Sequence, residues 1–312
     1  MAEHSMTRRS FSIASRQQQL GAALLIFFIL VFTASASVLL RALNNRSTDQ
    51  GRSLTSTTDL VAAKEALLAF AIMASTNPDS GPGRLPCPDI DMDSEGRADV
   101  SCNTANTVRG RLPRIALDAA GNQFNISPRD GGTDNQLWYA VSSNYRFSEA
   151  TSTAINASPT LATLSVDGSN DVVAVIIDAG APLMTLTAPT SNAAHYLEGD
   201  NVSGTNFVSS LLAPQTFNDR LMVIRRAELM SLVTSRVAQK LQTALGALPY
   251  PINATEFDAK VTASWFASWR PGDSAIHFPP STPANSIAIQ FAGCAIEFTI
   301  TPTSIDRSAT DC

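Results

Sequence analysis

The most chemically distinctive part of the chain is a run of carboxylates within residues 81–122. Asp89, Asp91 and Asp93 occupy alternate positions, and Glu95 and Asp99 follow, so five acidic side chains lie within eleven residues. Like charges at this density repel one another unless a cation or water spreads the charge. The spacing Asp-x-Asp-x-Asp matches the first three oxygen ligands of an EF-hand calcium loop.

The acidic segment departs from a calcium loop at two positions. The sixth residue should be Gly and is Ser94, and the twelfth should be Glu and is Val100. Gly96 can still supply a turn. Two interpretations therefore stay open: a calcium site formed by the five carboxylates, or a solvated acidic turn.

Four cysteines limit the redox and metal chemistry of the chain: Cys87, Cys102, Cys294 and Cys312. None belongs to a C-x-x-C pair, and the chain has three histidines, so a zinc site is disfavoured. In an exported protein an even number of cysteines indicates disulfides, and four cysteines allow three pairings. We favour Cys87–Cys102 and Cys294–Cys312 because each closes a short loop, which stabilises a fold by roughly 3 kcal/mol. The first pair would also close the acidic loop.

Sequence motifs of the common enzyme classes are absent. There is no G-x-S-x-G, P-loop or H-E-x-x-H, and no G-x-G-x-x-G follows a predicted strand. His195, beside Glu198 and Asp200, could act as an acid or base, but a surface-loop histidine is the simpler interpretation. Trp265 and Trp269 could stack a sugar, although packing is the commoner role of such residues. We predict no enzymatic activity and no cofactor other than calcium.

An uncharged apolar segment, Leu20 to Leu40, lies close to the N-terminus. It has three interpretations: a secretory signal cleaved after Ala36, an uncleaved membrane anchor, or a segment processed after Gly21. Residues 1–21 hold three arginines and one glutamate, a charge of +2, so the total of −5 leaves −7 for the remainder. This asymmetry favours a cytoplasmic N-terminus with an exported body, and the acidic body argues against nucleic acid as a partner.

The patterns behind this segment predict helices and strands in the exported body. Apolar spacing predicts helices over residues 54–76 and 227–246, the second closed by Gly246. Runs rich in β-branched residues predict strands at 158–168, 171–180, 259–266 and 286–302. The 171–180 strand is apolar throughout, which is typical of the centre of a sheet. We therefore expect an α+β fold with an antiparallel sheet.

Two groups of motifs resemble a known class of proteins. The leader "RQQQLG", followed at once by "AALLIFFIL", resembles the type IV prepilins, which include the pseudopilins of type II secretion. The motifs "GRLPCPD", "GRLPRIALD", "YLEGDN" and "NDRLMVIRRAEL" are similar to a set of prepilin-like proteins. The usual prepilin has Phe after the Gly and Glu as the fifth mature residue, whereas this chain has Ala22 and Ile26.

The resemblance implies a pilin-like architecture. A prepilin peptidase would cleave the basic leader, residues 1–21, between Gly21 and Ala22. One long helix would follow over residues 22–76, with 22–43 transmembrane and 44–76 amphipathic. Residues 77–312 would form a periplasmic antiparallel-sheet α+β head. The protein would then be a single-pass protein of the bacterial inner membrane that also reaches the cell surface if it enters a filament.

The same resemblance implies a structural function, namely a minor pilin or pseudopilin that binds other subunits through its N-terminal helix. A fifth-residue Glu in the usual class pairs with the amine of a neighbouring subunit, and Ile26 cannot. We therefore expect an initiating or tip component rather than a repeating subunit. The alternative is a membrane-anchored or secreted binding or adhesion protein with a calcium-stabilised acidic loop.

Overall fold

The computed structural model describes most of the chain behind residue 54. The described residues are 55–74, 82–91, 96–99, 102, 107–129, 137–147, 155–156, 161–180, 192–209, 217–278, 285–292, 294–309 and 312. The leader, Gly21, Ala22 and the apolar segment 22–43 lie outside them.

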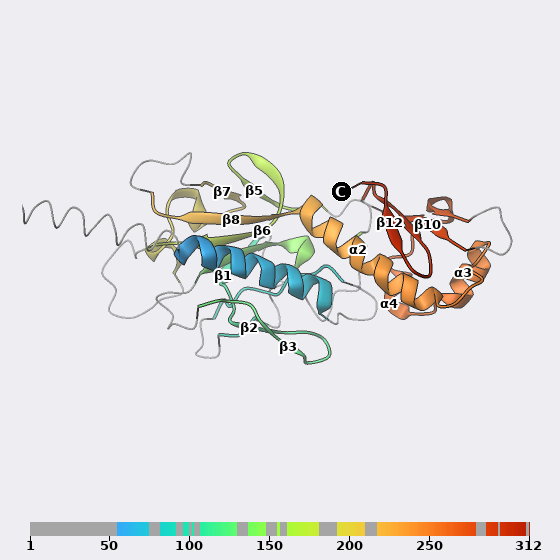
Figure 1. Cartoon of the computed structure of the whole chain (residues 1–312). Helices are drawn as coiled ribbons and strands as arrows, with labels where there is room; N and C mark the ends of the chain where they lie inside the picture. Colours follow the sequence, from blue (N-terminus) through green and yellow to red (C-terminus); the bar gives the residue numbers. More distant parts are fainter. Residues whose placement is uncertain are drawn as a thin grey trace, which may run out of the picture. The chain divides into compact units, whose positions relative to one another are not determined.

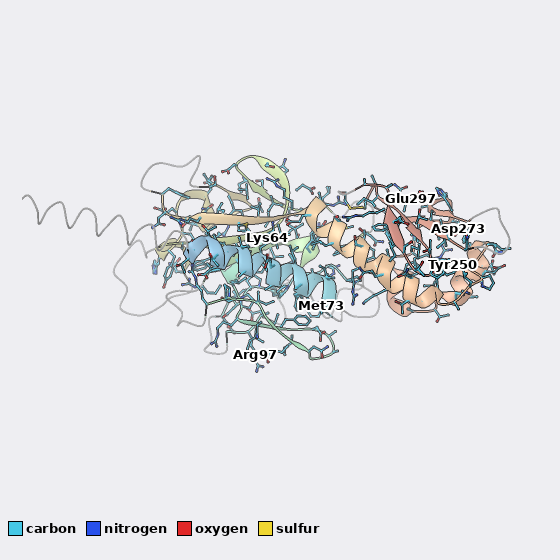
Figure 2. The ribbon with its side chains drawn as sticks, in the orientation of Figure 1. Lys64, Met73, Arg97, Tyr250, Asp273 and Glu297 are labelled. Atoms are coloured by element: carbon cyan, nitrogen blue, oxygen red, sulfur yellow. A yellow bond between two sulfur atoms is a disulfide. The ribbon has the colours of Figure 1, made fainter. Side chains whose placement is uncertain are left out.

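The first described helix covers residues 55–73 and is drawn in blue in Figure 1. Its buried side chains recur every three or four positions, at Leu60, Ala63, Leu67 and Phe70, which places them in one stripe. This stripe belongs to the main hydrophobic core of the protein. Met73, near the end of the helix, is exposed (Figure 2). The helix is thus amphipathic, with one face buried.

A six-stranded sheet has β6 (Ser169–Asp178) as its central strand. β4 (Trp138–Ser142) and β5 (Leu164–Val166) pair with one side of β6, and β8 (Arg220–Arg225) pairs with the other. β1 (Thr107–Arg111) extends the sheet beyond β4 in antiparallel orientation. β7 (Asn206–Phe207) extends it beyond β5 and runs parallel to that strand. The sheet is therefore mixed.

The apolar character of β6 follows from cover on both of its faces. Every side chain from 172 to 177 is fully buried. Val173 and Ile176 belong to the main core, whereas Val175 and Ile177 belong to a second cluster that also contains Trp138. A strand covered on both faces reads as a continuous apolar run, which is the pattern seen in the sequence.

Local turn chemistry sets the β5–β6 hairpin. Asp167 and Gly168 both have positive φ, 52° and 75°, as the two central residues of a type I′ turn require. A smaller hairpin joins β2 (Ile115–Leu117) to β3 (Gln123–Asn125). The Asp118 carboxylate accepts hydrogen bonds from the Ala120 and Asn122 amides in its turn. Both hairpins are thus closed by short-range interactions.

The helix α2 (Arg226–Leu245) starts directly after β8. Its buried side chains follow helical spacing (Leu229, Met230, Val233, Val237, Leu241, Leu245). It ends at Gly246, whose φ of 64° is a conformation that glycine adopts easily. The observed bounds lie within one residue of the predicted helix 227–246.

The remaining residues form a second sheet with two short helices, α3 (Ala254–Lys260) and α4 (Ser264–Ala267). The sheet is antiparallel, in the order β12 (Ile305–Arg307), β11 (Glu297–Ile300), β10 (Ile287–Gln290) and β9 (Ile276–His277). Short 3-10 helices occur at η2 (Ser143–Tyr145), η3 (Ala193–His195), η4 (Gly199–Val202) and η5 (Asp273–Ala275). Trp269 is fully buried, with its ring 6.2 Å from that of Phe291. It therefore packs in the core and is closed to a sugar.

The predicted strand at 259–266 is wrong, because α3 and α4 occupy this region. The Asn253 side chain accepts a hydrogen bond from the Glu256 amide, and Glu256 Oε2 accepts one from the Ile252 amide. These reciprocal bonds start a helix, and they outweigh the β propensity of the residues that follow.

The predicted fold class is also wrong. Within the described residues no helix combines the length and apolarity needed to cross a membrane. The helix that was expected to continue from residue 22 to 76 is described only over 55–73. The larger sheet is mixed, because the parallel strand β7 comes from a two-residue stretch without a strand signature. In the part of the chain that the structure describes, the expected antiparallel, pilin-like head is therefore replaced by a mixed six-stranded sheet, a four-stranded sheet, the β2–β3 hairpin and the helices that pack on them.

Candidate functional site

The acidic segment is tied to the strands that follow it by main-chain hydrogen bonds. The Asp89 amide donates to the Arg111 carbonyl (3.0 Å), and the Arg111 amide donates back to the Asp89 carbonyl (2.8 Å). Further along, the Arg114 amide donates to the Gly96 carbonyl (2.8 Å). Gly110 permits the first approach, since a Cβ there would lie 2.4 Å from the Asp89 carbonyl oxygen. Strand β1 thus fixes where the carboxylates lie.

Three of the five predicted ligands come together. Carboxylate oxygens of Asp89, Asp91 and Asp99 lie within 4.8 Å of one another. Asp89 is buried, Asp91 is exposed and Asp99 is half-buried, so the group opens to solvent on one side. The other two predicted ligands, Asp93 and Glu95, lie outside the described residues. Oxygen ligands at this spacing suit a hard cation such as Ca²⁺.

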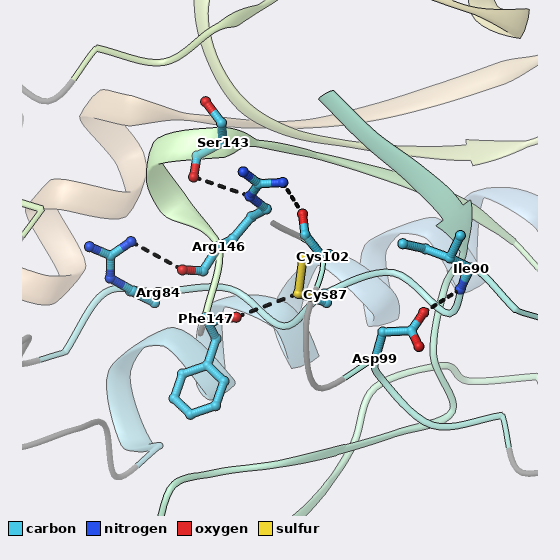
Figure 3. The surroundings of a disulfide bond; sticks show 8 residues. All are labelled: Arg84, Cys87, Ile90, Asp99, Cys102, Ser143, Arg146 and Phe147. Atoms are coloured by element: carbon cyan, nitrogen blue, oxygen red, sulfur yellow. Dashed lines mark hydrogen bonds between the residues drawn. A yellow bond between two sulfur atoms is a disulfide. The ribbon is translucent and has the colours of Figure 1, made fainter. Parts of the chain in front are cut away.

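Groups of the protein itself also contact these carboxylates and their segment. The Ile90 amide donates to Asp99 Oδ2 at 2.7 Å (Figure 3). The Arg114 side chain lies against the segment, because a Cβ on Gly96 would be 2.5 Å from Arg114 Nε. The Ile90 amide therefore already offsets part of the negative charge at Asp99. The cluster does not by itself require a metal ion.

A disulfide joins the two ends of the acidic segment. Cys87 and Cys102 are both buried and joined, with Cα atoms 5.9 Å apart. Figure 3 shows two arginines that bind main-chain carbonyls around it. Arg146 donates to the carbonyls of Cys102 and Ser143, and Arg84 donates to the carbonyl of Arg146 at 3.0 Å. The disulfide is thus anchored through side-chain-to-main-chain bonds.

Burial changes the acidity of these arginines but does not remove their charge. It lowers the pKa of Arg84 to about 10, so the guanidinium remains protonated at neutral pH. Arg111 is buried between two aromatic rings, with its guanidinium carbon 4.1 Å from the Trp138 centroid and 4.2 Å from that of Tyr196. Cation–π contacts of this kind stabilise a desolvated charge. Positive charges thus lie beside the acidic segment.

The second cysteine pair is also joined. Cys294 and Cys312 form a disulfide with Cα atoms 4.7 Å apart, and it ties the turn between β10 and β11 to the end of the chain. Both pairings are those expected from the sequence. The expected leader-peptidase residues, Gly21 and Ala22, lie outside the described residues.

The structure places His195 and Glu198 in separate interactions. His195 Nε2 lies 3.2 Å from the Asn192 side chain, whereas Glu198 Oε2 accepts a hydrogen bond from the Asn218 amide. The residue that the sequence analysis missed is Asp219, which is fully buried next to Glu198. The sequence shows only that Asp219 comes shortly before an apolar stretch, in "NDRLMV", and this position does not indicate that its side chain is buried.

Comparisons with family models, with curated proteins and with solved structures find no match to this chain.

Proposed function

We propose that this chain is a structural subunit without enzymatic activity, a minor pilin or pseudopilin-like component of a type IV pilus or type II secretion filament. The observation that supports the proposal is spatial. The motifs similar to prepilin-like proteins are scattered along the sequence, and they meet pairwise in the folded chain.

The first pair of motifs is "GRLPCPD" and "GRLP", which begin at Gly83 and Gly110. They are joined by the reciprocal main-chain bonds between Asp89 and Arg111. The second pair is "YLEGDN" (196–201) and "NDRL" (218–221). They are joined because Glu198 accepts from the Asn218 amide and donates its own amide to Asp219. Motifs that maintain one another's position are expected of a structural framework.

The apolar segment 22–43 supports a minor rather than a repeating role. A carboxylate in hydrocarbon is costly alone, so the usual fifth-residue Glu favours assembly with a partner amine. Ile26 offers no such pairing, and no acidic residue occurs between Leu20 and Arg41. We propose an initiating or tip component that is processed by a prepilin peptidase at the inner membrane and contacts other subunits through residues 22–43. The remainder of the chain would then lie on the periplasmic side.

Quantitative mass spectrometry of purified filaments tests this role. We expect the chain at a few copies per filament, and finding it as the main filament mass contradicts the proposal. Ile26→Glu restores the carboxylate and should raise incorporation several-fold without altering the fold. Leu30→Glu places the same charge away from the fifth position and serves as the matched control. Equal effects of the two substitutions would also contradict the proposal.

A second function is favoured by the short distances between the carboxylate oxygens of Asp89, Asp91 and Asp99. In this alternative the chain is an anchored or secreted binding or adhesion protein whose acidic loop is stabilised by calcium. The carboxylates would hold the ion, and the disulfide would limit the loop's motion. A calcium titration of the melting temperature separates a calcium-binding loop from a solvated acidic turn.

A further inference from the structure

Asp219 is a fully buried carboxylate with hydrogen bonds on one oxygen only. Its Oδ2 accepts from the Glu198 amide (3.0 Å) and from the Asn201 side-chain amide (2.9 Å). Its Oδ1 is buried and finds no hydrogen-bond donor among the described residues. An ionised carboxylate with one oxygen desolvated and unbonded is costly.

The neighbours of Asp219 form a junction of three chain segments. Glu198 Oε2 accepts from the Asn218 amide at 2.5 Å. The buried Asn201 side chain accepts from the Val208 amide (2.9 Å) and donates to the Val208 carbonyl (3.1 Å). We call Glu198, Asn201, Val208, Asn218 and Asp219 the Asp219 junction. Because its bonds run between side chains and main chain, a change in one carboxylate affects all three segments.

The two charged groups whose charges raise the pKa of Asp219 are both carboxylates, and arginines lie beside one of them. Glu198 approaches from the segment before η4, and Asp178 from the end of β6. Arg129 is bound to Asp178, with Nη2 and Oδ2 3.0 Å apart, and it also pairs with Asp59 of the helix 55–73. Arg220, next in the chain, lies opposite Asp178 in the β-ladder.

Burial is the main reason that the pKa of Asp219 rises from 3.8 to about 6. The hydrogen bonds from Glu198 and Asn201 lower the pKa, and the charges of Glu198 and Asp178 raise it further. A raised carboxyl pKa means that the folded junction binds a proton more tightly than the opened chain. Stability from this group is therefore complete below about pH 3.8 and is lost as the pH rises through about 6.

We propose that the Asp219 junction is a proton-responsive latch, which tightens when Asp219 takes up a proton in mildly acidic surroundings and loosens when the proton leaves. The latch lies beside Asp178, whose partner Arg129 also holds the helix 55–73. Proton uptake thus acts close to the ion pairs that anchor this helix. The inference does not depend on the proposed filament role.

Amide hydrogen exchange of the full-length chain between pH 7.5 and pH 5 tests the latch. The probes are the Glu198, Val208 and Asn218 amides, each of which donates within the junction. After correction for intrinsic exchange rates, their protection should increase about tenfold on acidification, given pKa values of about 6 folded and 3.8 opened. Protection that is flat, or that falls on acidification, overturns the proposal.

Three variants assign the effect. Asp219→Asn keeps an acceptor for both donors without a charge, so protection should no longer depend on pH. Glu198→Gln removes a facing charge and should move the midpoint to lower pH, and it also tests the latch if Asp219→Asn does not fold. His195→Gln is the matched control, because it removes an imidazole three residues before Glu198, and it should keep the tenfold change. Any of three results overturns the assignment to Asp219. The tenfold change could persist in Asp219→Asn, it could disappear in His195→Gln, or its midpoint could stay unchanged in Glu198→Gln.

Discussion

Arg129 Nε lies 2.6 Å from Asp59 Oδ2, which joins two residues that are 70 positions apart in the chain. The same guanidinium binds Asp178 through Nη2, so it connects the helix 55–73 to the end of β6. Burial alone would lower the pKa of Arg129, but its hydrogen bonds to Asp178 and Asp59 raise it above the ordinary value. The guanidinium thus stays charged where the protein needs a cation between two carboxylates.

Arg129→Gln should destabilise the fold by about 2–4 kcal/mol, because it removes the guanidinium that two half-buried carboxylates share. Urea denaturation, read as a shift of the midpoint at constant slope, measures the loss. Arg270→Gln is the control, because its partners Asp258 and Asp273 are exposed and such pairs contribute less than about 1 kcal/mol. Similar losses for both variants would show that Arg129 does not anchor the helix.

Peptide mapping without reduction should recover Cys87–Cys102 and Cys294–Cys312 as the cross-linked pairs. Replacing both cysteines of either pair by Ser should cost roughly 3 kcal/mol, since the sequence separations of 15 and 18 residues define loops of similar size. Thermal unfolding of the two double variants checks the cost. A different connectivity, or free thiols in protein purified without a reducing agent, contradicts the assignment.

Lys260→Met should destabilise the fold by about 1–2 kcal/mol, because the ammonium donates to three carbonyls at and beyond the end of α2. Its Nζ lies 3.3 Å from the Leu245 carbonyl, 3.0 Å from that of Ala247 and 2.7 Å from that of Pro249. Urea denaturation measures the loss of stability in this variant and in a control, Lys64→Met. The control removes a half-exposed ion pair with Glu228. Equal destabilisation of the two variants would show that the three Lys260–carbonyl hydrogen bonds stabilise the fold no more than a surface ion pair does.

Millimolar calcium should raise the melting temperature if the acidic loop binds the ion, because a ligand that binds only the folded state stabilises it by mass action. Asp91→Asn should abolish the rise, since Asp91 is exposed and brings a carboxylate to the group. Asp306→Asn, on the exposed part of β12, is the control and should keep it. A melting temperature that responds to neither calcium nor chelator leaves the solvated turn as the interpretation.

Predictions from the sequence succeeded where a local pattern has one physical explanation. The apolar run of β6 required cover on both faces, and the spacing of α2 required one buried stripe. The cysteines were close in sequence, and the structure joins the same two pairs. Asp89 and Asp91 approach each other at the alternate spacing seen in the sequence, whereas Asp99 joins them through the fold, where its side chain accepts a hydrogen bond from the Ile90 amide.

Predictions failed where tertiary contacts or short elements decide. The strand β7 has two residues and no pattern, and its parallel pairing depends on a partner 41 positions earlier in the chain. The helix α3 depends on the cap formed by Asn253 and Glu256, which outweighed the strand signal at 259–266. No sequence pattern marks Asp219 as buried, and only the folded structure shows it buried next to the Glu198 and Asp178 carboxylates.

The mature N-terminus tests the filament proposal most directly. Mass spectrometry of the intact chain purified from membranes should show a first residue of Ala22, with the N-methylation that the prepilin resemblance implies. This result requires cleavage after Gly21 with the apolar segment retained. A mature chain that begins at Ser37 or Val38 would instead establish ordinary signal-peptide cleavage, and it would contradict the filament role.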